Sequence, residues 1–432
     1  MALNKFQLQT LFEKKLAFQW EANSGLGDQI TWKNDIFKAQ DQPGASFGLR
    51  RPSRVTNVNG GIGVDYSLPG TTQPTVGYTQ LQDATVQLTL TTRLEANIQA
   101  SMEDLVYNIT DPDIEERYIK PAIVDIQNQQ NLLVAQAVAL AAGQSITVGT
   151  AFGSGVANTA QNFLQALQNA ESALIQRAAA SENERKILVQ HMGVAPLINP
   201  GAATLYNYGS DPRMAQASGR PIPKLGGFDV YRSPLLNSLS VTAPGTLTVA
   251  APGSGVTNGL TSWAQTWQLN VTGWSQAPQV GSIIAISGVD WVVPGLNTDT
   301  GIQATFAIQA ATLVSGSNYT LTLSEPLVYS GVFRNTTLSA AVATGTTVTL
   351  VQSGATLRPS YAFVPKAIVG SSPEVAIPRG VAYGKNFKAA QGFNFAVIED
   401  HWPGTLQNIT KLVAISGVAV PLPEGVVQIV GI

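Results

Sequence analysis

The chain has 432 residues, of which 12% are charged, and its formal net charge is −2. A chain of this length exceeds one compact core and predicts two or three domains, or one domain with a large insertion. The near-neutral charge gives no basis for strong attraction to nucleic acid or to an acidic membrane. The sequence has no cysteine, which excludes disulfides and thiolate metal sites. Its apolar runs are short, so we expect a soluble protein that is not secreted.

The first segment, residues 1–40, mixes apolar residues with lysines and a glutamate, and predicts a short amphipathic helix. This helix is either an exposed arm that docks on another surface or a helix packed on its own core. Residues 41–97 then predict an extended β-hairpin loop, because Val86, Leu88 and Leu90 alternate with polar residues in its second strand. An isolated hairpin is only marginally stable in water, so this loop needs its own domain or a neighbouring subunit to rest on.

Three arginines, Arg50, Arg51 and Arg54, cluster on the first strand of this loop. They form either a solvated face or an ion-pair site between subunits, and surface pairs add little stability. No lysine occurs between Lys38 and Lys120, so a lysine of this loop cannot form a covalent cross-link.

The longest predicted helix covers residues 111–143 and lies in a segment, residues 98–190, that also holds a second helix. Acidic residues at its start and Gly143 at its end mark its two termini. Pro121 lacks an amide donor and should kink this helix or begin a second segment there. The apolar residues of its buried face recur at three- and four-residue spacing: Ile119, Ile123, Ile126, Leu133, Ala137 and Leu140.

The second helix has a buried stripe of Phe163, Leu167, Ala170 and Leu174, and the strand KILVQ follows it. Residues 191–235 then alternate short apolar runs with turns and indicate a small mixed α/β domain. This pattern resumes in residues 358–390, and residues 391–432 contribute returning strands.

The region between these parts, residues 236–357, differs in composition. It holds one basic residue, Arg334, and three acidic residues, Asp290, Asp299 and Glu325. Apolar runs such as VGSIIAISGV and YTLTLSEPLVY, separated by turns, predict an inserted all-β domain, either a closed barrel or a sandwich.

The sequence offers little catalytic chemistry. His191 and His401 lack the spacing of metal ligands, and there is no GxxxxGK[ST], GxGxxG or GxSxG motif. We therefore expect no enzyme activity, no cofactor and no metal. Four tryptophans of the inserted region could line a sugar-binding surface, but core or interface packing is favoured: Trp263, Trp267, Trp274 and Trp291.

The order of these parts and several segments resemble the major capsid (coat) protein of tailed bacteriophages, in the short-tailed branch that carries an inserted β-barrel domain. The fold is shared with herpesvirus capsids. LRRPSRVTNV with ATVQLTLTTRLEANIQASMEDL is similar to the extended loop of the family, and ITDPDIEERYIKPAIVDIQ to the start of its spine helix. GGFDVYRSPLL, VGSIIAISGVDWVVP and LTLSEPLVYSG are similar to segments before and within the barrel. Ser282 stands where the family often has an aspartate.

The resemblance implies an α+β capsid fold with the spine helix in a peripheral domain and the α/β domain near a symmetry axis. The implied divisions are an N-terminal arm (1–40), an extended loop (41–97), a peripheral domain (98–190), an axial domain in two parts (191–235 and 358–390), an inserted barrel (236–357) and return strands to the peripheral and axial core (391–432).

For function, the resemblance implies hexamers and pentamers that close into an icosahedral phage head around double-stranded DNA. It also implies a scaffolding protein, a portal protein, a procapsid that expands on maturation and assembly in the host bacterial cytoplasm. A decoration protein is a further possible partner, contact with packaged DNA is expected to be weak, and no membrane contact is expected. The alternative is another β-rich virion protein from a tail, fibre or adhesin.

Overall fold

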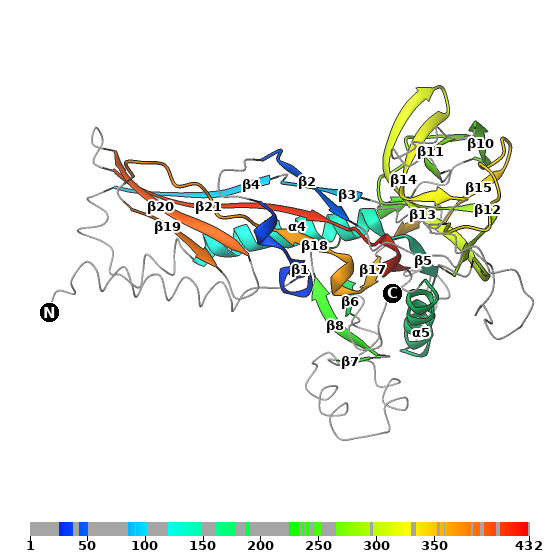
Figure 1. Ribbon diagram of the computed structural model, residues 1–432, viewed down its shortest axis with the longest axis horizontal. Coiled ribbons are helices and arrows are strands. Elements are labelled where there is room, and N and C mark those ends of the chain that lie inside the picture. The colour runs from blue at the N-terminus through cyan, green and yellow to red at the C-terminus, as the bar shows by residue number, and fades with distance from the viewer. Residues whose placement is uncertain are drawn as a thin grey trace, which may run out of the picture.

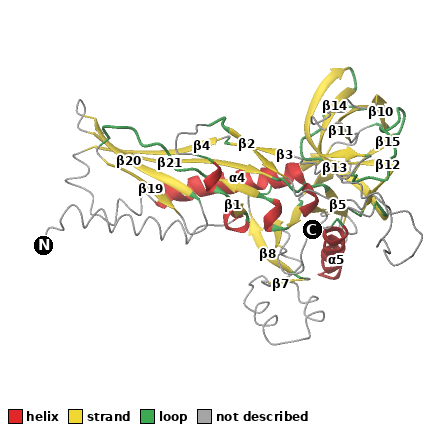
Figure 2. Ribbon diagram, viewed as in Figure 1, coloured by secondary structure: helices red, strands yellow, loops and turns green. Residues whose placement is uncertain are grey.

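The computed structural model shows an α+β protein rich in strands, with a β barrel at one end (Figure 1; Figure 2). This confirms the predicted fold class. The structure describes residues 26–37, 43–50, 85–90, 92–101, 120–147, 160–177, 186–190, 224–225, 227–233, 236, 239–241, 245–251, 265–293, 297–329, 334–351, 355–357, 359–381, 383–388, 393–402 and 407–430.

One sheet runs along the length of the molecule beside helix α4 (Lys120–Ala141), and we call it the long sheet (Figure 1). Its central strand is β21 (Gln407–Ala419), which pairs with β4, β18 and β20. Strands from both ends of the chain therefore meet in one sheet. Its other strands are β1 (Thr31–Trp32), β4 (Thr92–Ser101), β18 (Val369–Ser371), β19 (Tyr383–Lys388) and β20 (Asn394–Trp402).

Helix α4 packs against two different cores along its length. Ile123 and Ile126 are buried against the long sheet, as predicted. Further along, Val134 and Val138 enter a second core beside the central sheet described below. There the predicted Leu133 and Leu140 are only partly buried, because the helix meets a different sheet and turns a neighbouring face inward.

The end of α4 differs from the prediction. The helix ends at Ala141, and Gly143 does not adopt the left-handed conformation of a C-terminal cap. A Cβ atom on Gly143 would instead lie 3.0 Å from Nη1 of Arg177 and 3.3 Å from Oε2 of Glu325. Close packing, and not capping, requires glycine here.

Pro121 is exposed and lies in the first described turn of α4, which begins at Lys120. Residues 102–119 lie outside the described part of the chain. A kink or new helical segment at Pro121 therefore stays a prediction.

The base of the predicted hairpin loop is present as β2 (Ser46–Arg50) paired with β3 (Thr85–Thr89). Leu49, Leu88 and Leu90 are buried in a core shared with β21. The predicted second strand is broken into β3 and β4, because β3 pairs with β2 and β4 pairs with β21. Residues 51–84 of the loop lie outside the described residues.

The chain passes from the β2–β3 pair to the long sheet at the end of β3, where Thr89 crosses Gly417 of β21. A Cβ atom at Gly417 would lie 2.3 Å from the carbonyl oxygen of Thr89. The missing side chain at Gly417 therefore lets the end of β3 lie directly on the long sheet.

Residues 26–37 anchor the N-terminal part to this body through η1 (Leu26–Gln29), β1 and η2 (Asn34–Ile36). The amide of Gly27 donates to Oδ1 of Asn131 in α4 at 2.9 Å, and Nε1 of Trp32 donates to the Gly27 carbonyl at 2.8 Å. The Trp32 ring also covers Gly370, where a Cβ atom would lie 2.7 Å from it. The helix predicted near the N-terminus lies outside the described residues.

The second sheet, which we call the central sheet, has the order β5-β22-β17-β6-β8-β7. Helix α5 (Ala160–Gln176) contacts β5 and β22, and its Leu167, Ala170 and Leu174 are buried as predicted. The short helices η6 (Pro365–Ala367) and η7 (Pro423–Gly425) lie beside it. The strands are β5 (Gln144–Thr147), β6 (Lys186–Gln190), β7 (Lys224–Leu225), β8 (Phe228–Ser233), β17 (Ser360–Phe363) and β22 (Val426–Val430).

The inserted region is a closed six-stranded barrel. Of the two architectures predicted from the sequence, the barrel is therefore confirmed and the sandwich is wrong. Two segments connect the barrel to the rest of the protein, which we call the host body. They pair with each other as strands β9 (Leu239–Val241) and β16 (Ala355–Leu357). Apolar side chains such as Ile284, Trp291 and Phe306 fill the interior of the barrel. The strands are β10 (Leu247–Ala251), β11 (Gln265–Thr272), β12 (Ile283–Val292), β13 (Asp299–Ser315), β14 (Asn318–Val328) and β15 (Thr347–Leu350).

The glycine crossing gives a first prediction. Gly417→Ala should lower the free energy of unfolding by about 2 kcal/mol or more, because backbone atoms must move to admit the methyl group. Urea unfolding of the purified subunit measures this change. Gly27→Ala is the matched control, since its Cβ atom would meet nothing closer than 3.6 Å. Equal stability of the two variants would contradict the crowding at Gly417.

A buried tyrosine in the central sheet gives a second prediction. Tyr361 accepts a hydrogen bond from Nε2 of Gln428 at 3.5 Å, and Ser145 donates to the same amide group at 3.3 Å. Burial raises the pKa of Tyr361 from 10.0 to about 12, and the Gln428 hydrogen bond opposes this only partly. The folded chain therefore keeps its proton at pH values where the unfolded chain loses it.

The stabilisation from neutral Tyr361 should be complete below pH 10 and be lost as pH rises to about 12. Its loss corresponds to about 3 kcal/mol, because each pKa unit is worth about 1.4 kcal/mol. Urea unfolding at pH 8 to 12 should show a shallower decline for Tyr361→Phe than for the parent chain. Parallel declines would mean that Tyr361 ionises normally in the folded protein.

Candidate assembly surfaces and the barrel joint

The predicted arginine cluster is described only at its first member. Arg50 ends β2 opposite Thr85, and its side chain is exposed. Arg51 and Arg54 lie outside the described residues. Their role in contacts between subunits stays a prediction.

The histidines and acidic residues give no metal centre in the described part of the chain. His401 lies in β20 opposite Asn408, and His191 lies outside the described residues. Among the residues that the structure describes, no group of three or more His, Cys, Asp or Glu side chains could hold a metal ion. None of the described helices is long and apolar enough to span a membrane.

Two tryptophans of the barrel serve packing, as predicted. Trp274 and Trp291 are buried in the barrel core, and the Trp291 ring lies 5.0 Å from the ring of Phe306. Trp267 lies in β11, and Trp263 lies outside the described residues.

Pairs of charged side chains lie on and beside the long sheet. Lys388 on strand β19 pairs with Glu374 at 3.4 Å, and Lys411 pairs with Glu95 at 2.6 Å. Such partly exposed pairs add little stability. Lysines on an edge strand do, however, discourage unwanted pairing with other strands.

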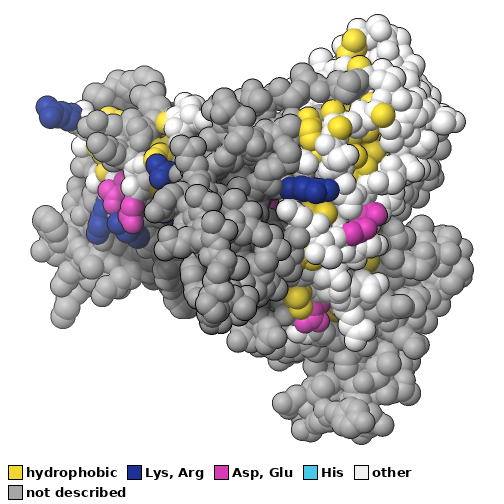
Figure 3. All heavy atoms as spheres, turned by 45° about the vertical axis from the view of Figure 1, so that its right-hand side comes forward, with side chains coloured by type: hydrophobic (Ala, Val, Ile, Leu, Met, Phe, Trp, Pro, Cys, Tyr) yellow, Lys and Arg dark blue, Asp and Glu magenta, His cyan; other side chains and the backbone are white. Residues whose placement is uncertain are grey.

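The barrel surface is different, because few charged side chains interrupt it (Figure 3). Two apolar side chains at the end of β13, Leu313 and Val314, are more than half exposed, at 57% and 58%. A weakly charged surface of this kind tolerates contact with another uncharged surface, since no charge must be desolvated.

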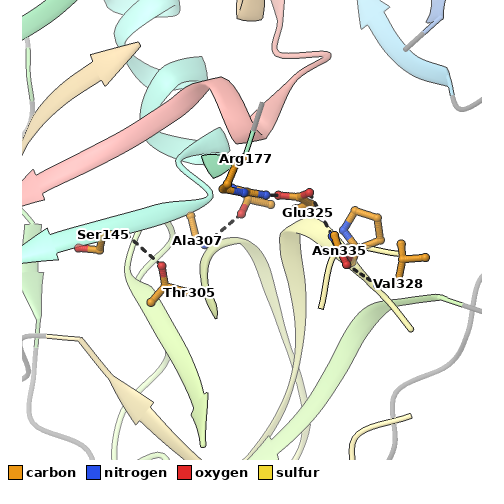
Figure 4. A network of polar contacts seen from close by, with 9 residues as sticks. Ser145, Arg177, Thr305, Ala307, Glu325, Val328 and Asn335 are labelled. Carbon is orange, nitrogen blue, oxygen red and sulfur yellow. Dashed lines mark hydrogen bonds and ion pairs between the residues drawn. The ribbon is translucent and has the colours of Figure 1, made fainter. Parts of the chain in front are cut away.

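The barrel meets the host at a buried ion pair. Arg177 follows the last turn of α5, and its Nη2 atom lies 2.5 Å from Oε2 of Glu325 in β14 (Figure 4). The two side chains are only 5% and 3% exposed. The other carboxylate oxygen of Glu325 accepts a hydrogen bond from Asn335 at 3.1 Å. Both oxygens are therefore engaged, which a buried carboxylate requires.

The Arg177 side chain is also stacked on the barrel. Its guanidinium carbon lies 3.9 Å from the centre of the Trp291 ring, a cation–π distance. Glycine at position 143 leaves space for the guanidinium on the host side. Arg177 is thus enclosed by host backbone, a barrel ring and a barrel carboxylate.

Further contacts surround this ion pair, and we call the whole region the joint. The amide of Ser145 in β5 donates to Oγ1 of Thr305 in β13 at 3.0 Å (Figure 4). Ile283 and Ala307 of the barrel belong to the core of the central sheet, and Val430 of the host belongs to the barrel core. Barrel and host therefore share apolar packing as well as charge.

The sequence analysis missed the joint, although composition contained one signal for it. The inserted region has a single basic residue, Arg334, whose guanidinium donates to the carbonyls of Thr336 and Thr337 at 3.0 Å. A buried Glu325 therefore needs a cation from outside the barrel. The sequence alone could not identify that cation as Arg177.

Solved structures from phages resemble the chain in fold. A structure from Mycobacterium phage Che8 has a TM-score of 0.45 and 10% identity over 94% of this chain and 90% of the other. The mature capsid of bacteriophage PhiM1 has a TM-score of 0.45 and 10% identity over 94% and 86%. The capsid of Ralstonia phage GP4 has a TM-score of 0.43 and 10% identity over 95% and 90%.

No protein-family model matches the sequence, and the comparison with curated proteins gave no match.

The joint gives a third prediction. Arg177→Met and Glu325→Leu should each lower the free energy of unfolding by about 3–5 kcal/mol, because each leaves one buried charge without its partner. Urea unfolding provides the measurement. Lys388→Met removes a pair of similar chemistry with side chains 70% and 47% exposed, and should cost less than about 1 kcal/mol. Equal losses at the two sites would contradict the burial of the joint.

Proposed function

We propose that this chain is the major capsid protein of a tailed phage and forms the icosahedral head that encloses packaged double-stranded DNA. Its copies associate into hexamers and pentamers, in a procapsid that assembles on a scaffolding protein and expands on maturation. The chain acts as a structural protein in the virion shell and is assembled in the host cytoplasm.

The base of the hairpin loop carries this proposal. Its two strands are held by Leu49, Leu88 and Leu90 in the core of their own subunit, and by the crossing at Gly417. Residues 51–84 connect these fixed strands. A connection of this length inside a domain usually has a function of its own. Firm attachment at both ends suits a segment that binds a neighbouring subunit and transmits force to the body.

The charge distribution supports a shell rather than a nucleic-acid-binding protein. The net charge of −2 leaves no excess of cations to neutralise phosphates. The inner surface of the shell therefore binds packaged DNA weakly, so that DNA can move along it during packaging and release. Partners implied by this role are the scaffolding protein, a portal protein and other copies of the chain, with a decoration protein as an optional addition.

Assembly in cells tests the proposal and is our fourth prediction. Expressed together with the scaffolding protein of its own phage, the chain should yield closed or polyhead-like shells in negative-stain electron microscopy. A uniformly monomeric product under these conditions would contradict a capsid role. Fibres or tail-like tubes would favour a different virion protein.

A deletion variant provides the control for this experiment. Removal of residues 71–78, inside the connection between β2 and β3, leaves the described body intact. The variant should give a folded monomer by circular dichroism and size exclusion but no closed shells. Normal shells from the deletion would remove the intersubunit role that we assign to the loop.

A further inference from the structure

We propose that the Arg177–Glu325 pair is a registration contact, which fixes one position of the barrel on the host body. The inference concerns the position of the barrel in each subunit and does not depend on the capsid role. It rests on the geometry of the joint and on the physical cost of burying ions.

The Arg177–Glu325 pair adds little net free energy to folding. Removing both ions from water costs several kcal/mol each, and their attraction only about offsets this when hydrogen bonds are complete. Apolar packing across the joint already involves Ile283, Ala307 and Val430. The apolar contacts supply attraction between barrel and host without needing a charge.

What the apolar contacts lack is direction. Hydrophobic attraction follows the area buried and is non-directional, so a barrel held only by Ile283, Ala307 and Val430 could settle at more than one angle. An arginine, by contrast, presents its donors in a fixed planar fork. Arg177 meets Glu325 only when α5, β14 and the Trp291 ring are aligned.

The surroundings of the pair restrict it to this one arrangement. Asn335 fixes Glu325, because its amide donates to the carboxylate at 3.1 Å and to the carbonyl of Pro326 at 2.8 Å. The side-chain oxygen of Asn335, Oδ1, in turn accepts a hydrogen bond from the backbone amide of Val328 at 2.9 Å. On the host side, the guanidinium packs closely on Gly143, where a Cβ atom would lie only 3.0 Å from Nη1 of Arg177. Any rotation of the barrel would leave both charges buried and unpaired.

The insertion cannot satisfy Glu325 by itself, which makes the contact specific for the docked state. Arg334 is the single basic residue of residues 236–357, and it is bonded to the carbonyls of Thr336 and Thr337. Every position of the barrel that buries Glu325 away from Arg177 therefore leaves this carboxylate without a cation, which raises the free energy of that position. This is specificity through the cost of the wrong arrangements.

Spin-label distances test the proposal in the full chain. The sequence has no cysteine, so Ser172→Cys on α5 and Ser339→Cys on the barrel, both exposed, give two unique labels. The parent background should give one narrow distance distribution by double electron–electron resonance. The Arg177→Met/Glu325→Leu variant replaces the pair by apolar side chains, and should remain folded by circular dichroism while the distribution broadens or gains a second maximum.

Two further variants make the outcome decisive. Arg177→Lys keeps the charge but removes the fork, and should also broaden the distribution. Lys388→Met/Glu374→Leu removes an exposed pair on the long sheet and should leave it narrow. A distribution as narrow as that of the parent in both the Arg177→Met/Glu325→Leu and the Arg177→Lys backgrounds overturns the proposal, because the apolar contacts and the Ser145–Thr305 hydrogen bond would then fix the barrel without the ion pair.

Discussion

The arrangement of host and barrel depends on one constraint, the burial of a charged arginine and a charged glutamate at their joint. Buried ions are tolerated only when they are paired, so the elements that carry the two partners must both be in place. Arg177 follows the end of helix α5, Glu325 lies in β14, and the absent side chain of Gly143 leaves room beside the pair. Helix α4 and helix α5 therefore meet the barrel at one point, although strand β14 lies far from both helices in the sequence.

The long body follows a related principle, in which glycine permits two parts of the chain to cross at close range. Gly370 lies under the ring of Trp32, and Gly417 lies under the carbonyl of Thr89. The first crossing holds the N-terminal segment and the second holds the base of the hairpin loop. Gly370 and Gly417 lie on strands β18 and β21, which pair with each other. The N-terminal segment and the base of the hairpin loop are therefore attached to the same sheet.

The patterns in the sequence predicted the helices and strands better than they predicted which strands pair and which residues pack together. The alternation that includes Leu88 and Leu90 and the stripe of Leu167, Ala170 and Leu174 indicated buried faces correctly, whereas Val86 is only partly buried. The same patterns could not show that β3 and β4 belong to different sheets, or that Gly143 serves packing. Those features depend on contacts with Gly417, Arg177 and Glu325, which are distant in the sequence. The ion pair was missed for the same reason.

If the chain forms a shell as proposed, each copy must transmit load from one neighbour to the next, and the hairpin base and the joint lie on one continuous body. The hairpin base is fixed on β21, which also packs along α4, and α4 leads directly to Gly143 at the joint. A pull on the hairpin loop is therefore carried by paired strands and a packed helix to the barrel, and no flexible linker intervenes along this route. If the barrel is held in one register by Arg177, a displacement at one end of the subunit must move the other end with it, because packed interiors deform little.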